Sequence, residues 1–219
     1  MMKIKSIFVL MIYVMILISC RTTNKTSDSV TGMIYDNEGE CVAGVKIFVE
    51  GRLIAQSDIY GHFYVPIEEL NRNNKVELIK DEYESVSLEI DPFASVKMLY
   101  VVMRSYRQML NEIEQSIADG EYEKGLELCH KAKEIKKSMY MDYLESVILI
   151  CKKNYYPAIH ILEKIVDNEK TNKYCILLLS DAYEMTSQKE KAIAMLEEKS
   201  KEFPDNDISD RLASLCSMN

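Results

Sequence analysis

The spacing of hydrophobic residues changes twice along the chain and divides it into three parts. Residues 7–18 form one uninterrupted apolar run. Between Val30 and Met103 apolar and polar residues alternate, which is typical of half-buried strands. From Tyr106 onward apolar residues recur every three to four positions, as on one face of a helix. The pattern therefore predicts an apolar leader, a strand region and a helical region.

Seven short strands are expected in the strand region. The alternation is clearest at Val45, Ile47 and Val49, and turn-forming residues such as those of Asp58–Gly61 separate the runs. We expect strands over residues 30–35, 44–49, 53–57, 62–66, 75–80, 85–90 and 97–103. Short strands with turns at this spacing predict a seven-stranded antiparallel β-sandwich covering residues 30–103.

A repeat of 33 to 34 residues organises the helical region, residues 106–217. Small residues recur at this distance, and a larger apolar residue follows each by four positions: Gly125, Ala158 and Ala192, then Cys129, Leu162 and Leu196. We expect three helix pairs and a final helix, over residues 106–118, 122–136, 139–152, 155–168, 172–185, 188–202 and 208–216. Stacked helix pairs of this length bury a continuous core. The predicted fold class is α+β in two domains, with an all-α solenoid following the sandwich.

The first twenty residues predict an export signal. Lys3 and Lys5 precede the apolar run, whose 12 residues suit a signal sequence and are fewer than the roughly 20 that a membrane-spanning helix needs. Residues 17–20, Leu-Ile-Ser-Cys, resemble the bacterial lipobox, which implies cleavage before Cys20 and lipid on its sulfur. We expect residues 1–19 to be a signal peptide and residues 20–29 a flexible tether, with the protein lipid-anchored outside the cytoplasm. An uncleaved membrane anchor is the alternative.

The strand region resembles the carboxypeptidase regulatory-like domain, a transthyretin-like β-sandwich. The resemblance is carried by Gly32, Gly39, Val42, Gly44, Ser57, Asp58, Gly61 and Phe63, and it departs at Glu40, Cys41 and Glu82. It implies a folded spacer or interaction module without catalysis. The motif also has a structural interpretation: Asp58 caps a turn, Gly61 takes a positive φ, and Phe63 fills the core.

The helical region resembles tetratricopeptide repeats. The small residues of the 33- to 34-residue repeat carry the resemblance, together with Leu179, Ser180, Tyr183 and Pro204 in the last unit. It implies that the first helix of each pair lines a groove that binds a peptide or protein. By repeat register the groove residues would be Tyr140, Tyr143, Val147, Tyr174, Leu177, Asp181 and Glu184. The alternative is that these residues only cover the next repeat.

Charge and reactive residues narrow the function classes. The net charge is −8, and it becomes −10 when residues 1–19 and their two lysines are removed, which argues against nucleic-acid binding. The three histidines, His62, His130 and His160, belong to no catalytic or metal-binding motif. We therefore expect no enzyme activity, cofactor or metal.

Five cysteines follow Cys20, and no two of them form a C-x-x-C pair. They are Cys41, Cys129, Cys151, Cys175 and Cys216. The last four lie in apolar helical contexts and are expected to be buried thiols. Whether any of the five forms a disulfide stays open at this stage.

Together these observations predict a non-catalytic envelope adaptor. Its helical repeats would bind a protein or peptide partner, and the strand region would act as a spacer or second contact. One alternative is a carbohydrate-binding lipoprotein that uses Tyr60, Phe63 and Tyr64 to stack on sugar rings. A hydrolase with an unrecognised site is a further alternative.

Overall fold

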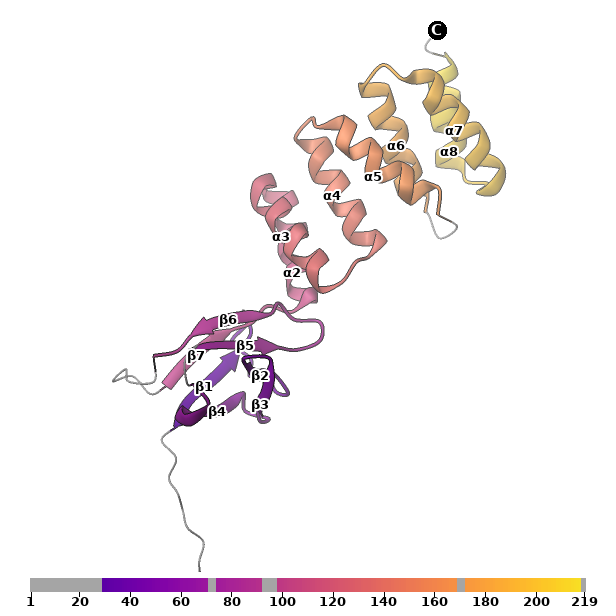
Figure 1. Cartoon of the computed structure of the whole chain (residues 1–219). Coiled ribbons are helices and arrows are strands. Elements are labelled where there is room, and N and C mark those ends of the chain that lie inside the picture. The colour runs from indigo at the N-terminus through magenta and orange to yellow at the C-terminus, as the bar shows by residue number, and fades with distance from the viewer. Residues whose placement is uncertain (1–28, 71–73, 92–97, 169–171, 218–219) are drawn as a thin grey trace, which may run out of the picture.

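The computed structural model of this chain describes residues 29–70, 74–91, 98–168 and 172–217. Strands occupy the N-terminal part and helices the C-terminal part, so the fold is α+β (Figure 1). The helices follow one another in chain order and lead away from the strands. The predicted signal peptide, the lipid site at Cys20 and the tether up to residue 28 lie outside the described residues.

Seven described strands lie within about two residues of their predicted positions. They are β1 (Ser29–Tyr35), β2 (Lys46–Val49), β3 (Arg52–Gln56), β4 (His62–Pro66), β5 (Lys75–Ile79), β6 (Val86–Glu89) and β7 (Met98–Val102), with a short 3₁₀ helix, η1 (Ile67–Glu69), after β4. In each of β1, β2, β4 and β5 buried residues alternate with more exposed ones. This period of two matches the alternation of apolar and polar residues from which the strands were predicted.

The predicted seven-stranded antiparallel sandwich is wrong. The described strands form two small sheets, one of three strands in the order β4-β1-β7 and one of four in the order β3-β2-β5-β6. β1 and β7 run parallel, with Thr31 opposite Met98 and Tyr35 opposite Val102. Alternation places a side chain on a face but does not say which strand lies alongside or in which direction. The pairing of the first strand with the last was therefore not predictable from it.

One hydrophobic core lies between the two sheets. It contains Val30 and Ile34 of β1, Ile47 of β2 and Leu78 of β5, together with the fully buried ring of Phe63.

Gly32 and Gly61 allow close packing at this core. A Cβ atom at Gly32 would lie 2.3 Å from the ring of Phe63, and one at Gly61 would lie 2.5 Å from the carbonyl oxygen of Ile34. Gly61 also has φ +77°, and Asp58 Oδ1 accepts hydrogen bonds from the N–H groups of Tyr60 and His62. The structural roles predicted for Asp58, Gly61 and Phe63 are confirmed.

The described helices match the predicted pairs and final helix. They are α2 (Tyr106–Asp119), α3 (Tyr122–Ile135), α4 (Met139–Cys151), α5 (Tyr155–Val166), α6 (Lys173–Met185), α7 (Lys189–Glu202) and α8 (Asn206–Ser217). Each packs on the next, and α2, α4, α6 and α8 also contact one another in succession. This arrangement places the first helices of successive pairs side by side.

The same turn closes the first helix of every pair. Gly120, Lys153 and Ser187 take positive φ values of 75°, 60° and 58°. In each case the N–H of the next residue bonds the carbonyl five positions earlier, as in Gln188 to Tyr183 at 2.8 Å. This is the Schellman motif, which satisfies carbonyls at a helix end. The three turns are spaced like the small-residue repeat, so backbone and sequence share one period.

The small residues of that repeat lie where helices are closely packed. Ala158 and Ala192 are fully buried. A Cβ at Gly125 would lie 2.9 Å from Ile148 Cδ1, so α3 and α4 approach closely there. The buried apolar side chains form two clusters, one within α2, α3 and α4 and the other from α5 to α8.

A short connection joins the strands to the helices. Ser105 caps α2 by accepting from the N–H of Gln108, whose side chain accepts from the N–H of Ser105, a capping box. Arg104 pairs with Glu84 at 3.1 Å and with Glu112 of α2 at 3.7 Å. These contacts fix the first helix against the strand part.

Candidate functional site

An aromatic cleft of about 280 Å³ lies between the first helices of the second and third pairs. Met139, Tyr140 and Tyr143 come from the beginning of α4, and Tyr174 comes from the beginning of α6. Ile165 of α5, Asn172 and Cys175 complete the wall. Because α4 and α6 contact each other, residues some 30 positions apart line one depression, which we call the tyrosine cleft.

Polar contacts fix the orientation of the cleft tyrosines. The rings of Tyr140 and Tyr143 stack with their centroids 6.3 Å apart and their planes 20° apart. The Tyr140 hydroxyl donates to Glu114 of α2 at 2.7 Å. Since that hydrogen bond is lost on ionisation, and since partial burial and the Glu114 charge also disfavour the phenolate, the pKa of Tyr140 rises to about 12. Tyr140 is therefore a neutral hydrogen-bond donor at physiological pH.

The polar residue of the cleft wall has a local structural role. Asn172 caps α6 by accepting from the N–H of Cys175 at 3.2 Å. Burial raises the pKa of the Cys175 thiol, so this sulfur is a protonated, apolar wall atom and not a nucleophile. The cleft is thus an aromatic and aliphatic depression without an activated group.

Three of the seven predicted groove residues meet in this cleft, namely Tyr140, Tyr143 and Tyr174. Val147 and Leu177 lie half-buried on the same two helices, and Leu177 packs against the apolar cluster of α5 to α8.

The other two predicted groove residues pair with the last helix. Arg211 of α8 lies 2.7 Å from Asp181 and 2.5 Å from Glu184, and it also donates to Ser180 at 3.1 Å. Asp181 and Glu184 are thus paired with α8 and do not line the tyrosine cleft.

Sequence reasoning missed Met139, Ile165, Asn172 and Cys175. Tyr140 and Tyr143 could be found because register in the repeat assigns them to the first helix of a pair. Ile165 lies near the end of the second helix of a pair, and Asn172 precedes α6. The repeat register assigns groove residues to the first helix of each pair and therefore includes neither. A search at the ends of the second helices would have found Ile165.

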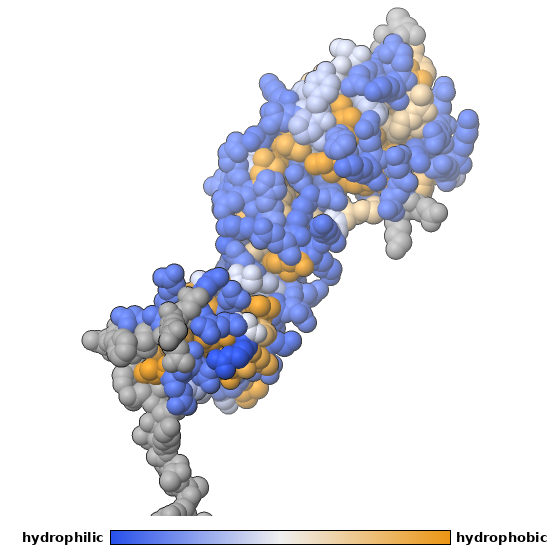
Figure 2. All heavy atoms as spheres, viewed as in Figure 1, coloured by the Kyte–Doolittle hydropathy of each residue, from blue (hydrophilic) through white to orange (hydrophobic). Residues whose placement is uncertain are grey.

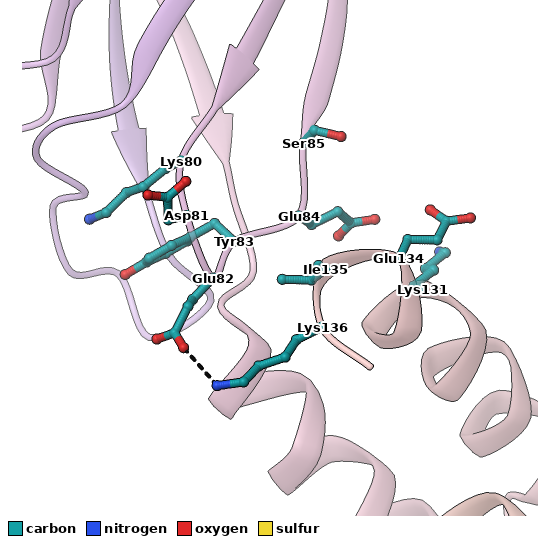
Figure 3. Close-up of a pocket in the computed structure, with 10 residues that line it drawn as sticks. All are labelled: Lys80, Asp81, Glu82, Tyr83, Glu84, Ser85, Lys131, Glu134, Ile135 and Lys136. Carbon is teal, nitrogen blue, oxygen red and sulfur yellow. Dashed lines mark hydrogen bonds and ion pairs between the residues drawn. The ribbon is translucent and has the colours of Figure 1, made fainter. Parts of the chain in front are cut away.

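A second depression, of about 470 Å³, lies where the strand part meets α3 (Figure 3). Residues 80–85 form one wall and Lys131, Glu134, Ile135 and Lys136 the other. Lys136 bridges the walls to Glu82 at 3.0 Å, and Lys80 lies 4.5 Å over the ring of Tyr83. Four of its charged residues, Glu82, Glu84, Lys131 and Lys136, form ion pairs, and the depression lies at the junction of the strands and the helices.

The histidines lie apart from one another. His62 Nδ1 is 3.4 Å from Asp58, exposed His130 is 3.8 Å from Glu145, and His160 is exposed on α5. Among residues 29–70, 74–91, 98–168 and 172–217, no group of three or more His, Cys, Asp or Glu side chains could hold a metal.

The prediction that four helical cysteines are buried thiols was only partly right. Cys129 and Cys175 are buried, and burial raises the pKa of Cys129 to about 12. Cys151 and Cys216 are exposed, so for these two the prediction is wrong. Cys151 is the last residue of α4, and Cys216 lies on the outer side of the final helix, where another element would be needed to cover it.

The sugar-stacking strip proposed from Tyr60, Phe63 and Tyr64 does not form. Tyr60 and Tyr64 are exposed, but Phe63 is fully buried in the core. The side chains of neighbouring strand residues point to opposite faces, which separates Phe63 from Tyr64.

No protein-family model matches this chain, and a search of curated proteins found no match. The described part of the chain contains no helix long and apolar enough to cross a bilayer.

Proposed function

We propose that this protein is a non-catalytic, lipid-anchored adaptor of the cell envelope. Its helical part would bind an apolar side chain of a peptide or protein partner in the tyrosine cleft. The strand part would act as spacer or second contact. The observation that carries this proposal is the convergence of Tyr140, Tyr143 and Tyr174, taken from two helices, on one depression.

The exposure of the cleft residues supports binding. Tyr174 is 61% exposed and Tyr140 49% exposed, although each is large enough to fill a seam. Tyrosine supplies contact area at low entropic cost and is enriched among residues that dominate binding energy. Over the visible face of the helices most surface residues are hydrophilic, with apolar residues confined to narrower patches between them (Figure 2).

The size of the cleft points to one side chain of a larger partner. Sites for drug-sized ligands typically measure about 300 to 1,000 Å³, and this one measures about 280 Å³. The cleft is too small to enclose a long ligand and large enough for one aromatic or aliphatic residue. The resemblance to tetratricopeptide repeats supports a peptide as the class of partner.

The proposed attachment of the protein to a membrane of the cell envelope depends on the first twenty residues. The lipobox-like Leu-Ile-Ser-Cys at residues 17–20 supports attachment through Cys20. The net charge of −10 for residues 20–219 supports a protein partner over a nucleic acid.

A peptide-display selection against residues 20–219 tests the binding proposal. Selected peptides should carry an aromatic or aliphatic anchor residue, and Tyr174→Ala should weaken their binding about five- to thirty-fold, as loss of a dominant contact does. Tyr156→Ala is the matched control, because Tyr156 of α5 is 71% exposed and lies outside the cleft. Peptides that bind the Tyr174→Ala variant as tightly as the unaltered protein would overturn the proposal.

A further inference from the structure

The strand residues on the outer face of the three-stranded sheet include no carboxylate, lysine or arginine. Ten residues of its described strands alternate with the buried residues and point away from the core: Ser29, Thr31, Met33 and Tyr35 of β1, His62, Tyr64 and Pro66 of β4, and Met98, Tyr100 and Val102 of β7. We call this surface the β1 face. It carries three tyrosines and two methionines, and His62 is its only titratable group apart from the tyrosines.

The strand register gathers these side chains into rows. Met33 lies opposite His62 on one side and Tyr100 on the other. Thr31 lies between Tyr64 and Met98 in the same way. Tyr64 is 57% exposed and Tyr100 69% exposed. The face is therefore a continuous amphipathic surface and not a set of isolated apolar residues.

The outer face of the four-stranded sheet has the opposite character. Lys75 lies opposite Glu89, and Glu77 lies opposite Ser87. Lys75 also pairs with Glu77 at 3.1 Å, and Lys46 extends the charged surface onto β2. Such charged positions are what a solvent-facing sheet normally presents. The absence of lysine, arginine and carboxylate side chains is thus particular to the β1 face.

The chain enters the fold through this sheet. Ser29 is the first residue of β1, which is the middle strand of the three. Eight residues, 21–28, without an apolar side chain separate it from Cys20, and eight residues span at most about 30 Å. If Cys20 carries lipid, the strand part cannot move far from the bilayer.

The chemistry of the face suits the interfacial layer of a bilayer. Tyrosine is enriched where lipid headgroups meet hydrocarbon, because its ring is apolar and its hydroxyl is polar. The protein as a whole is acidic and would be repelled by anionic headgroups. The strand residues of the β1 face include no carboxylate, and the Asp58 carboxylate in the turn before β4 lies 3.4 Å from His62 Nδ1, so this face meets less of that repulsion than the charged four-stranded sheet.

We infer that the β1 face docks on the interfacial region of the bilayer to which Cys20 is attached. This rests on the lipid anchor of the proposed function. Docking would lay the three-stranded sheet against the membrane and leave the charged four-stranded sheet and the helical stack directed toward other partners.

Tryptophan fluorescence tests the inference, because the chain contains no Trp. The full lipidated chain carrying Tyr100→Trp is placed in phosphatidylcholine vesicles with brominated acyl chains. Emission should shift to shorter wavelength and be quenched by the bromines. Tyr156→Trp is the matched control, since Tyr156 is as exposed as Tyr100 but lies on α5, and its emission should be unchanged. Equal quenching in the two variants, or none in either, overturns the inference.

Two further readouts separate this inference from the proposed function. Flotation of the vesicles shows whether the lipidated chain is anchored: a chain that floats without quenching at residue 100 refutes docking alone, and a chain that does not float refutes both the anchor and the docking. Tyr64→Trp on β4 repeats the measurement on another strand and should give the same result as Tyr100→Trp. A blue shift without bromine quenching would indicate that a second copy covers the face, and this also overturns bilayer docking.

Discussion

The strand part and the helical part differ in how far apart in the chain their contacting elements lie. Among the strands, a single core joins residues from Val30 to Met103, and the first described strand pairs with the last. Among the helices, each packs on its neighbours, and the buried residues divide into two successive clusters. We therefore expect a destabilising substitution to reduce stability throughout the strand part, but only in neighbouring helices of the helical part.

Truncating a central side chain in each of these regions gives the largest expected effect. Phe63→Ala should lower the unfolding free energy by about 3 to 5 kcal/mol and remove amide protection throughout both sheets. Leu196→Ala should cost about 2 to 5 kcal/mol but reduce protection mainly from α5 to α8, because Leu196 belongs to the apolar cluster of these helices. Hydrogen exchange measured by mass spectrometry distinguishes the two patterns. Equal loss of protection in α2 and α8 after Leu196→Ala would contradict the comparison.

A glycine substitution in the strand part should have the next largest effect. In Gly61→Ala the new Cβ would lie 2.5 Å from a backbone oxygen that cannot move aside, at φ +77°, and we expect a loss of about 2 to 4 kcal/mol. Gly39→Ala is the control, because Gly39 has φ +83° but open space around it. We expect it to lose only the roughly 1 to 2 kcal/mol that a Cβ costs in the left-handed backbone region. Denaturant unfolding measures both, and equal losses would show that the close approach is unimportant.

Helix caps provide a smaller test within the helical part. Ser138 caps α4 by accepting from the N–H of Met141 and also bonds the Tyr106 hydroxyl at 2.8 Å. Ser138→Ala should therefore cost about 1 kcal/mol. Gln188 precedes α7 without a side-chain cap, so we expect Gln188→Ala to cost much less. Thermal unfolding followed by circular dichroism compares them, and the prediction fails if Gln188→Ala costs as much as Ser138→Ala.

Gly125→Ala should have the smallest effect. The new Cβ would lie 2.9 Å from the terminal methyl group of Ile148, which can rotate away. Alanine gains up to about 1 kcal/mol of helix propensity over glycine, and this offsets the local rearrangement. We expect a change within about 0.5 kcal/mol of zero by denaturant unfolding. A loss as large as that of Gly61→Ala would mean that the helical seams are as unyielding as the strand core.

The same difference in contact distance explains what could be predicted from the sequence. Helix positions and the small residues of the repeat follow from local spacing, and the structure shows Ala158 and Ala192 fully buried. Strand positions follow as well, because alternation is a local property. The parallel pairing of β1 with β7 joins segments more than 60 residues apart. The local alternation of either segment does not indicate which strand it pairs with. That is why the arrangement of the sheets was predicted wrongly.

The tyrosine cleft was partly predictable for a related reason. The repeat register predicted that Tyr140, Tyr143 and Tyr174 share a groove, and all three line the cleft. It could not show that Arg211, on a helix outside the repeat register, pairs with Asp181 and Glu184. Those two acids are therefore engaged by α8, while the tyrosines keep exposed surface.

Site-specific photo-crosslinking in the native cell tests the central claim most directly. A photoreactive phenylalanine derivative replaces Tyr174 in one variant and Tyr156 in another, and crosslinked products are identified by mass spectrometry. We expect a defined protein adduct at position 174 that is absent at position 156 and is lost when Met139→Asp places a charge in the cleft. The same adducts at both positions, or an adduct at 174 that survives Met139→Asp, would contradict binding in the tyrosine cleft.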